Sequence, residues 1–216
     1  MKRSRLSATS LSSSKKRLKT DLHLALAHQP YLLNADTAYF SFYRYKKGGF
    51  AVTSVCFTGH RRIESSDMYG LKTLLDSTIC GLVKRGVTDF YCGGALGFDT
   101  MCAHMVLYLK KRKALDIKLH LVLPCSNEEQ TKNWSYNDKQ EFYAILMAAD
   151  DIEYIGSEYT KECMKKRNAR MVELADGCVC YYDDSIARSG TGQTVRMANA
   201  KGIEVINLFD MASDNR

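Results

Sequence analysis

Short apolar runs alternate with longer stretches of helical periodicity over most of this chain, and this alternation constrains its fold more than any other feature. The apolar runs, which we interpret as strands, are 52–57, 89–92, 119–123, 152–155, 178–182 and 204–208. The helical stretches between them are 67–84, 100–113, 138–149, 161–175 and 194–201. Strands that alternate with helices are joined by right-handed crossovers. The sequence therefore predicts an α/β fold with a mostly parallel sheet that helices cover on both faces.

The length and composition fit one such domain with additional segments at its ends. The chain has 216 residues, of which 45% are hydrophobic and 25% charged, and this excludes a wholly disordered protein. No apolar run approaches the length of a membrane span, so we expect no membrane partner. We divide the chain into a basic disordered tail (1–20), an aromatic-rich arm (21–50), the α/β domain (51–210) and a C-terminal tail (211–216).

The net charge of +7 comes from the N-terminal tail. Residues 1–20 contain seven lysines and arginines and no acidic residue, which leaves 24 basic and 24 acidic residues in the rest of the chain. We therefore expect contact with nucleic acid only through the tail and not through a basic face of the domain. Lys2-Arg3 and Lys15-Lys16-Arg17 resemble a bipartite nuclear import signal. The expected location is cytoplasmic, or nuclear in a eukaryotic setting.

The eight cysteines indicate a reducing compartment rather than a metal site. They stand at positions 56, 80, 92, 102, 125, 163, 178 and 180. Most of them lie inside apolar runs, where a thiol acts as a small buried hydrophobe. The sequence contains no Cys-x-x-Cys pair. We therefore predict no zinc or other metal site.

The segments that follow the first two strands carry residues suited to an anion, at the edge of a parallel sheet where ligands collect. Thr58-Gly59-His60-Arg61-Arg62 follows the first strand, and an ordinary solvated turn is the alternative interpretation. Cys92-Gly93-Gly94-Ala95-Leu96-Gly97-Phe98-Asp99 joins the second strand to a helix. Its glycines allow backbone N–H groups to surround a phosphate, and tight packing of the turn is the alternative. Asp99 can cap the helix or accept a hydrogen bond from a ribose hydroxyl.

A second glycine segment, Ser189-Gly190-Thr191-Gly192-Gln193-Thr194, follows the fifth strand and precedes a helix. Its N–H and hydroxyl groups can hold a second phosphate. The helix before that strand carries Arg167, which reaches the site only if the helix begins near these loops. Trp134, in the long loop after the third strand, either stacks on a base or anchors the loop, and the two alternatives rank equally.

Four of these motifs, in order and spacing, resemble the SLOG superfamily and in particular its YpsA-like branch. They are Thr58-Gly59-His60-Arg61, the segment 93–99, Arg167-Asn168 with Met171, and Ser189-Gly190-Thr191 with Thr194-Val195-Arg196. Together they extend over roughly residues 52–208. The resemblance implies a Rossmann-like three-layer αβα sandwich. It also implies a site for a nucleotide or an ADP-ribose-type ligand, formed by the two glycine loops.

Two groups within this superfamily imply competing activities. LOG enzymes cleave N-glycosidic bonds with a glutamate three residues beyond a loop threonine, and Thr194 stands at that position here. A hydroxyl cannot replace a carboxylate in that chemistry. DprA binds single-stranded DNA and has a loop similar to 92–99, but its Ala-His pair stands one residue nearer the aspartate than Ala103-His104 does. The neutral domain also lacks the basic groove that strand binding needs.

We therefore predict that the chain binds or senses a small-molecule nucleotide or nucleotide-derived ligand, of the ADP-ribose, NAD or nucleoside phosphate type. The predicted ligand-binding residues are Thr58, Gly59, Arg61, Gly93, Gly94, Gly97, Asp99, Arg167, Asn168, Ser189, Gly190, Thr191 and Gly192, with Trp134 as the candidate for base stacking. The alternatives are a hydrolase of N-glycosidic or phosphate bonds, with Asp99 or Asp183 as acid/base, and a single-stranded DNA-binding protein. Homo-oligomerisation stays open.

Deleting residues 1–20 is expected to leave the melting temperature nearly unchanged. The tail has no aromatic residue and too little apolar surface to offset the entropy lost on ordering it. The same deletion is expected to lower any affinity for nucleic acid. Thermal denaturation and DNA binding of the two chains measure both effects. A large fall in melting temperature contradicts the first expectation, and equal DNA affinity contradicts the second.

Overall fold

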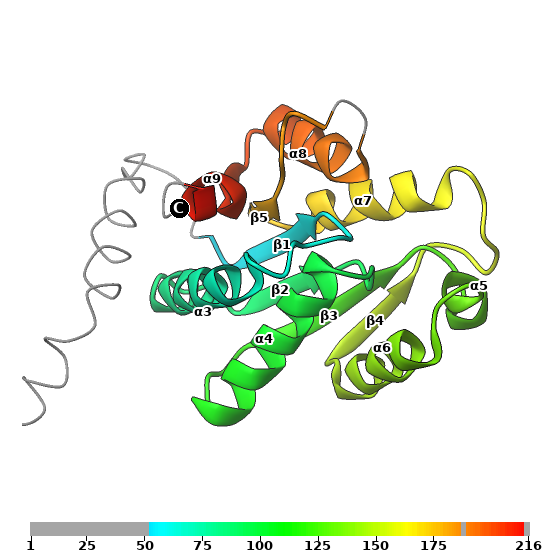
Figure 1. Ribbon diagram of the computed structural model, residues 1–216, viewed down its shortest axis with the longest axis horizontal. Helices are drawn as coiled ribbons and strands as arrows, with labels where there is room; N and C mark the ends of the chain where they lie inside the picture. Colours follow the sequence, from blue (N-terminus) through cyan, green and yellow to red (C-terminus); the bar gives the residue numbers. More distant parts are fainter. Residues whose placement is uncertain (1–51, 187–188, 214–216) are drawn as a thin grey trace, which may run out of the picture. The chain divides into compact units, whose positions relative to one another are not determined.

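A computed structural model describes residues 52–186 and 189–213, and these form an α/β domain around one six-stranded sheet (Figure 1). The tail and arm expected at 1–20 and 21–50 lie outside the described residues, as do 214–216. The strands are β1 (Ser54–Gly59), β2 (Asp89–Cys92), β3 (Lys118–Leu123), β4 (Asp151–Tyr154), β5 (Gly177–Tyr181) and β6 (Glu204–Asn207). They lie in the order β4-β3-β2-β1-β5-β6, and every neighbouring pair is parallel. The predicted Rossmann-like α/β fold is confirmed.

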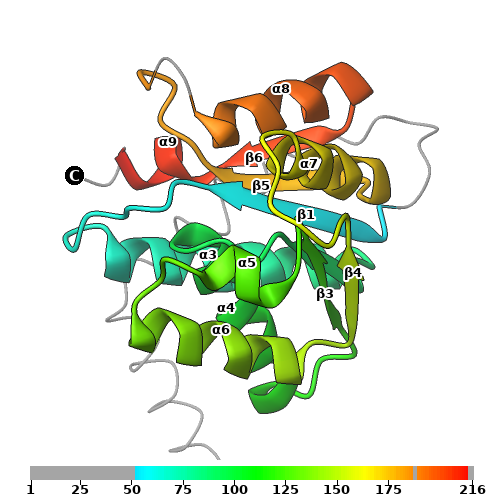
Figure 2. The same cartoon turned by 90° about the vertical axis from the view of Figure 1, so that its right-hand side faces the viewer.

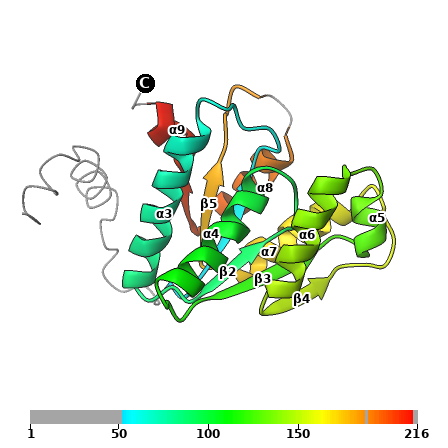
Figure 3. The same ribbon diagram turned by 60° about the horizontal axis from the view of Figure 1, so that its bottom comes forward.

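Helices cover both faces of the sheet, as predicted. They are α3 (Met68–Lys84), α4 (Phe98–Arg112), α5 (Asn127–Thr131), α6 (Tyr136–Ala148), α7 (Cys163–Leu174), α8 (Gly190–Lys201) and α9 (Leu208–Ser213). Figure 2 shows α7 and α8 on one face, and Figure 3 shows α3, α4 and α6 over the other. Within the described residues, no helix is long and apolar enough to cross a membrane.

The strands lack polar alternation because both of their faces are buried. In β1, Val55 and Phe57 join the core under α3 and α4, whereas Cys56 between them joins the core under α7 and α8. All three side chains are almost completely inaccessible to solvent. Every residue of β5 is buried as well. Because both faces of these strands are buried, their sequences are apolar runs, and such runs predicted the strands from the sequence.

The beginning of α8 differs from the prediction. The segment 189–194 was expected to be a loop, with the helix beginning at Thr194, but α8 begins at Gly190. Ser189 is its N-cap, and the Ser189 hydroxyl accepts a hydrogen bond from the N–H of Gly192 at 2.9 Å. A serine cap satisfies an N–H group that the first turn leaves open, and this favours a helical start despite two glycines. The glycine segment is therefore the cap and first turn of a helix.

The structure also contains two short helices that hydrophobic periodicity did not predict. Helix α5 has only five residues, too few to show a period, and lies in the long loop after β3. Helix α9 carries the chain beyond residue 210, the expected end of the domain, and Met211 packs against the main core.

The strand order places a crevice at the carboxyl ends of β1 and β5. The chain moves outward from β1 to β4 on one side and then returns to place β5 on the other side of β1. The connections on the two sides of this switch therefore diverge, and ligands bind at such a point in open parallel sheets. All four sequence motifs follow or approach these strand ends.

Lys201, in the last turn of α8, caps the C-terminus of α7. Its ammonium group donates to the carbonyl oxygens of Val172, Glu173 and Ala175 at 2.7–2.8 Å. We expect Lys201→Met to lower the free energy of unfolding by about 1–2 kcal/mol, because three carbonyls at a helix C-terminus lose a charged donor. Urea unfolding followed by circular dichroism measures the loss. The exposed Lys165→Met is the control, and equal behaviour of the two variants would contradict this role.

Candidate functional site

A cavity of about 290 Å³ lies at the carboxyl ends of β1 and β5, where the strand order places the crevice. Its lining comprises Phe57, Thr58, Gly59, His60, Arg61, Ala95, Asp99, Met164, Arg167, Asn168, Met171, Ser189, Gly190 and Thr191. The fold thus brings together residues from all four motifs. Of the predicted ligand-binding residues, Gly93, Gly94, Gly97 and Gly192 stand outside this lining. We call this space the switch-point cavity.

Arg167 is the buried cation of the switch-point cavity. It lies in the second turn of α7, and only 8% of its side chain is exposed. Its Nη2 atom contacts the sulfur of Met164 at 3.9 Å, but Nε and Nη1 are buried without a hydrogen-bond partner. Burial lowers the pKa of Arg167, and nearby Asp99 counteracts this. A buried guanidinium with two unused donor atoms is costly unless another group satisfies them.

Asp99 is the buried anion beside Arg167. Its Oδ2 atom stands 3.7 Å from Arg167 Nη1, and it accepts hydrogen bonds from the N–H groups of Gly93 at 2.9 Å and Ala95 at 3.3 Å. Burial raises the pKa of Asp99, while Arg167 and the two N–H groups lower it. The carboxylate therefore ties the glycine loop to the helix that follows. It does this by accepting from loop N–H groups, not by capping the helix that it belongs to.

The glycines at 93–97 are required by close packing. A Cβ atom at Gly93 would overlap the Arg167 guanidinium. Gly97 has a φ of 82°, and a Cβ there would overlap the backbone of Arg61. Gly94 has a φ of 64° and lies against Leu123. Residues with a side chain rarely adopt such positive φ values. The loop can therefore pack against the Arg167 guanidinium and the Arg61 backbone only because glycines occupy these positions.

The glycines of α8 have a different environment. The N–H groups of Gly190 and Thr191 have no acceptor within their own helix, and both residues line the switch-point cavity. A Cβ atom at Gly190 would meet nothing within 4 Å. Gly192 instead packs under the Tyr182 ring, whose hydroxyl would lie 2.8 Å from an added Cβ. The open side of the helix N-terminus is therefore at Gly190.

His60 lines the switch-point cavity but was not among the predicted ligand-binding residues. Its Nε2 atom accepts a hydrogen bond from the N–H of Asp183 at 2.9 Å. Burial lowers the pKa of His60, with Asp183 acting in the opposite direction. Because Nε2 accepts this hydrogen bond, we assign the ring proton to Nδ1, where it can act as a donor. Its position between Gly59 and Arg61 in the first motif is the sequence signal that could have identified His60 as a site residue.

Three residues with proposed chemical roles stand outside the cavity lining. Thr194 is 1% exposed, and its hydroxyl donates to the carbonyl of Gly190 at 3.1 Å. The Asp183 carboxylate accepts from the N–H of Ser185 at 3.0 Å. Trp134 packs edge-on against Phe142, with ring centroids 5.5 Å apart. In the part of the chain that the structure describes, no three His, Cys, Asp or Glu residues are grouped to hold a metal ion.

Residues 55–211 match the YpsA family model, described as the YspA SLOG family. The chain belongs to this family. An uncharacterised SPbeta prophage-derived protein of Bacillus subtilis, YoqJ, is 30% identical over 63% of this chain and 84% of its own length. A UPF0398 protein of Bacillus licheniformis is 26% identical over 56% of this chain and 66% of its own length.

Among solved structures, this member of the YpsA family is similar to DNA processing protein A of Helicobacter pylori, which binds single-stranded DNA. The TM-score is 0.49 and the sequence identity 21%, over 72% of this chain and 64% of the other.

The Asp99–Arg167 pair can be tested by a double-mutant cycle. Asp99→Asn leaves the buried guanidinium without a counter-charge, so we expect it to lower the free energy of unfolding by about 3 kcal/mol. Adding Arg167→Met removes the unpaired charge, and the double variant is expected to be more stable than Asp99→Asn alone. Chemical denaturation of the four proteins measures the cycle. Losses that simply add would contradict a direct coupling between the two charges.

Proposed function

We propose that this chain binds a nucleotide or a nucleotide-derived small molecule and holds its phosphate group in the switch-point cavity. The observation that carries the proposal is the Arg167 guanidinium, whose Nε and Nη1 atoms are buried without a hydrogen-bond partner. Asp99 is its nearest counter-charge, at 3.7 Å, and that distance is too long for a hydrogen bond. An anionic ligand would accept hydrogen bonds from these two nitrogens of Arg167.

Phosphate is the anion that suits the groups around Arg167. Guanidinium groups pair with phosphate oxygens through two parallel hydrogen bonds. The α8 N-terminus adds the N–H groups of Gly190 and Thr191 and the positive end of a helix dipole. Arg61 lines the same cavity, and its charge lowers the pKa of both Asp99 and Arg167. Two arginines and one carboxylate line the cavity, and this excess of positive charge favours a ligand with negative charge.

The remaining groups suit a ribose joined to that phosphate. A cavity of about 290 Å³ is small for a complete ligand site but sufficient for a phosphate with its sugar. An ionised carboxylate accepts about four hydrogen bonds, so Asp99 retains acceptor capacity beyond its two loop N–H groups. Thr58 and Asn168, whose side chains carry a hydroxyl and an amide, also line the cavity.

A hydrolase has less support than a binding module. The Thr194 hydroxyl is buried and bonded to its own helix, so it offers no acid or base to the cavity. Asp183 stands outside the lining. Asp99 lies inside the lining, but its Oδ2 atom already accepts hydrogen bonds from two N–H groups of the glycine loop, which gives this oxygen a structural role.

Gly190→Val tests the site with little risk to the fold. A side chain at Gly190 enters open space at the α8 N-terminus and would obstruct a phosphate there. We expect the purified variant to lose the thermal shift that AMP, ADP-ribose or NAD gives to the wild type. A ligand at 100 times its Kd stabilises a protein by about 2.7 kcal/mol, so the shift is measurable.

Gly70→Val is the matched control, because a Cβ at this exposed position of α3 also meets nothing within 4 Å. It is expected to keep the full ligand-induced shift, while circular dichroism shows both variants folded. Equal shifts for Gly190→Val and the wild type would place the ligand elsewhere. A wild-type protein that responds to none of the three ligands would overturn the proposed function.

A further inference from the structure

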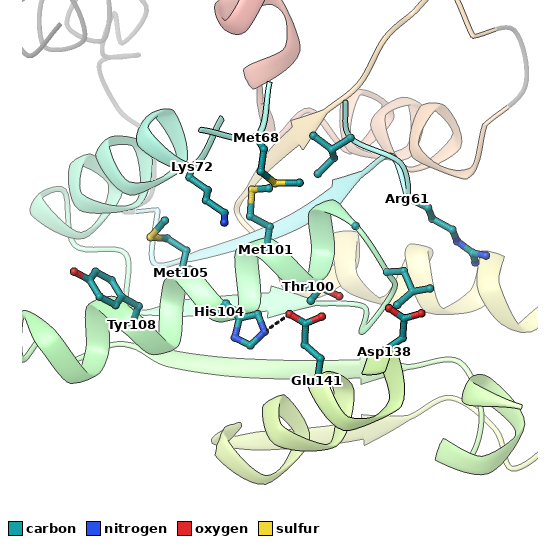
Figure 4. A pocket seen from close by; sticks show the side chains of 13 residues that line it. Arg61, Met68, Lys72, Thr100, Met101, His104, Met105, Tyr108, Asp138 and Glu141 are labelled. Atoms are coloured by element: carbon teal, nitrogen blue, oxygen red, sulfur yellow. Dashed lines mark hydrogen bonds and ion pairs between the residues drawn. The ribbon is translucent and has the colours of Figure 1, made fainter. Parts of the chain in front are cut away.

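A second and larger cavity, of about 660 Å³, lies over α4 between α3 and α6 (Figure 4). Its lining includes Arg61, Met68, Met101, His104, Met105 and Glu141. This volume falls within the usual range for small-molecule sites. We call this space the α4 groove.

The α4 groove adjoins the switch-point cavity. Arg61 lines both. The segment 95–101 separates them, because Ala95 and Asp99 face the switch-point cavity whereas Leu96 and Thr100 face the groove. From Asp99 to His104, α4 rises by about 7.5 Å. The Arg61 backbone packs against Gly97 at this boundary, so a ligand whose phosphate lies at Arg167 would reach the groove across the rim that Arg61 forms.

One side of the α4 groove is rich in thioether sulfur. Met68 comes from α3, and Met101 and Met105 come from the side of α4 that faces it (Figure 4). Methionine sulfur makes favourable contacts with aromatic rings, and its flexible side chain adapts to a flat ring. This side of the groove suits a heteroaromatic ring.

The opposite side of the α4 groove offers hydrogen-bond acceptors. Glu141 and Asp138 project from α6, and Glu141 Oε1 lies 2.8 Å from His104 Nε2 (Figure 4). Carboxylates accept hydrogen bonds from the exocyclic amino groups of nucleobases. A ring with its face on the methionines and an amino group at its edge matches both sides.

We infer that the α4 groove binds the amino-bearing nucleobase of the ligand whose phosphate lies at Arg167. The inference rests on the proposed function and narrows it to nucleotides whose base carries an exocyclic amino group. Glu141 is the acceptor for the amino group, and Met101 and Met105 contact the face of the ring. Arg61 marks the point where the ligand passes from one cavity to the other.

Three probes separate the base from the phosphate: AMP, IMP and ribose 5-phosphate. IMP has a carbonyl where AMP has the amino group, and ribose 5-phosphate has no base. Titration calorimetry with the full chain is expected to give AMP at least about a tenfold higher affinity than either other probe, the scale of one base-edge contact. Arg167→Met is expected to abolish binding of all three.

Substitutions in the α4 groove are expected to act on the base alone. Glu141→Met should bring AMP down to the affinity of IMP, and Met105→Lys should weaken both, while ribose 5-phosphate binds each variant as it binds the wild type. The exposed Glu158→Met, outside both cavities, is the control for the loss of one charge. It is expected to retain the preference for AMP.

The outcomes distinguish the inference from the proposal beneath it. Equal affinities of the three probes for the wild type, or an AMP preference that survives Glu141→Met, overturn the groove assignment. The switch-point site then still stands, provided that Arg167→Met abolishes binding of ribose 5-phosphate. If none of the three probes binds the wild type, the groove assignment fails together with the proposed function.

Discussion

The buried pair of Arg167 and Asp99 is the interaction on which the other features of the site depend. An arginine side chain that is 8% exposed brings a full charge into the protein, and the nearest carboxylate oxygen lies 3.7 Å away. Such a pair gains less than it loses by desolvation unless further hydrogen bonds satisfy both partners. Asp99 obtains them from the Gly93 and Ala95 N–H groups, whereas two nitrogens of Arg167 do not. This asymmetry supports our proposal that Arg167 binds an anion.

The glycines of the two glycine-rich motifs have different roles, although the two motifs look alike in the sequence. Gly93 provides the space that the Arg167 guanidinium occupies, and Gly97 provides the space and the positive φ for the approach of Arg61. Neither of these glycines lines the switch-point cavity. Gly190 has open space beside it and lies at the first turn of α8. Among the glycines of these motifs, an added Cβ meets no atom within 4 Å at Gly190 alone, and we propose that the ligand reaches the helix N-terminus there.

Periodicity was sufficient to predict the parallel sheet, because strands such as β5 are buried along their whole length. It did not predict the start of α8, where the Ser189 cap overrides the low helix propensity of glycine. Nor could it find the unsatisfied donors of Arg167, since hydrogen bonding of a side chain depends on long-range packing. The α4 groove was missed for the same reason. Its methionines belong to α3 and α4 and come together only in the folded chain.

The central claim is that the buried guanidinium of Arg167 is an anion site, and NMR of its Nε–H group tests this most directly. Inorganic phosphate is titrated into the full chain, and the arginine Nε resonances are assigned by comparison with Arg167→Met. The account predicts that the Arg167 Nε–H proton moves downfield and exchanges more slowly with water as the site fills, because it gains a charged acceptor. An Arg167 resonance that stays in place while the other arginine signals respond to phosphate would contradict it.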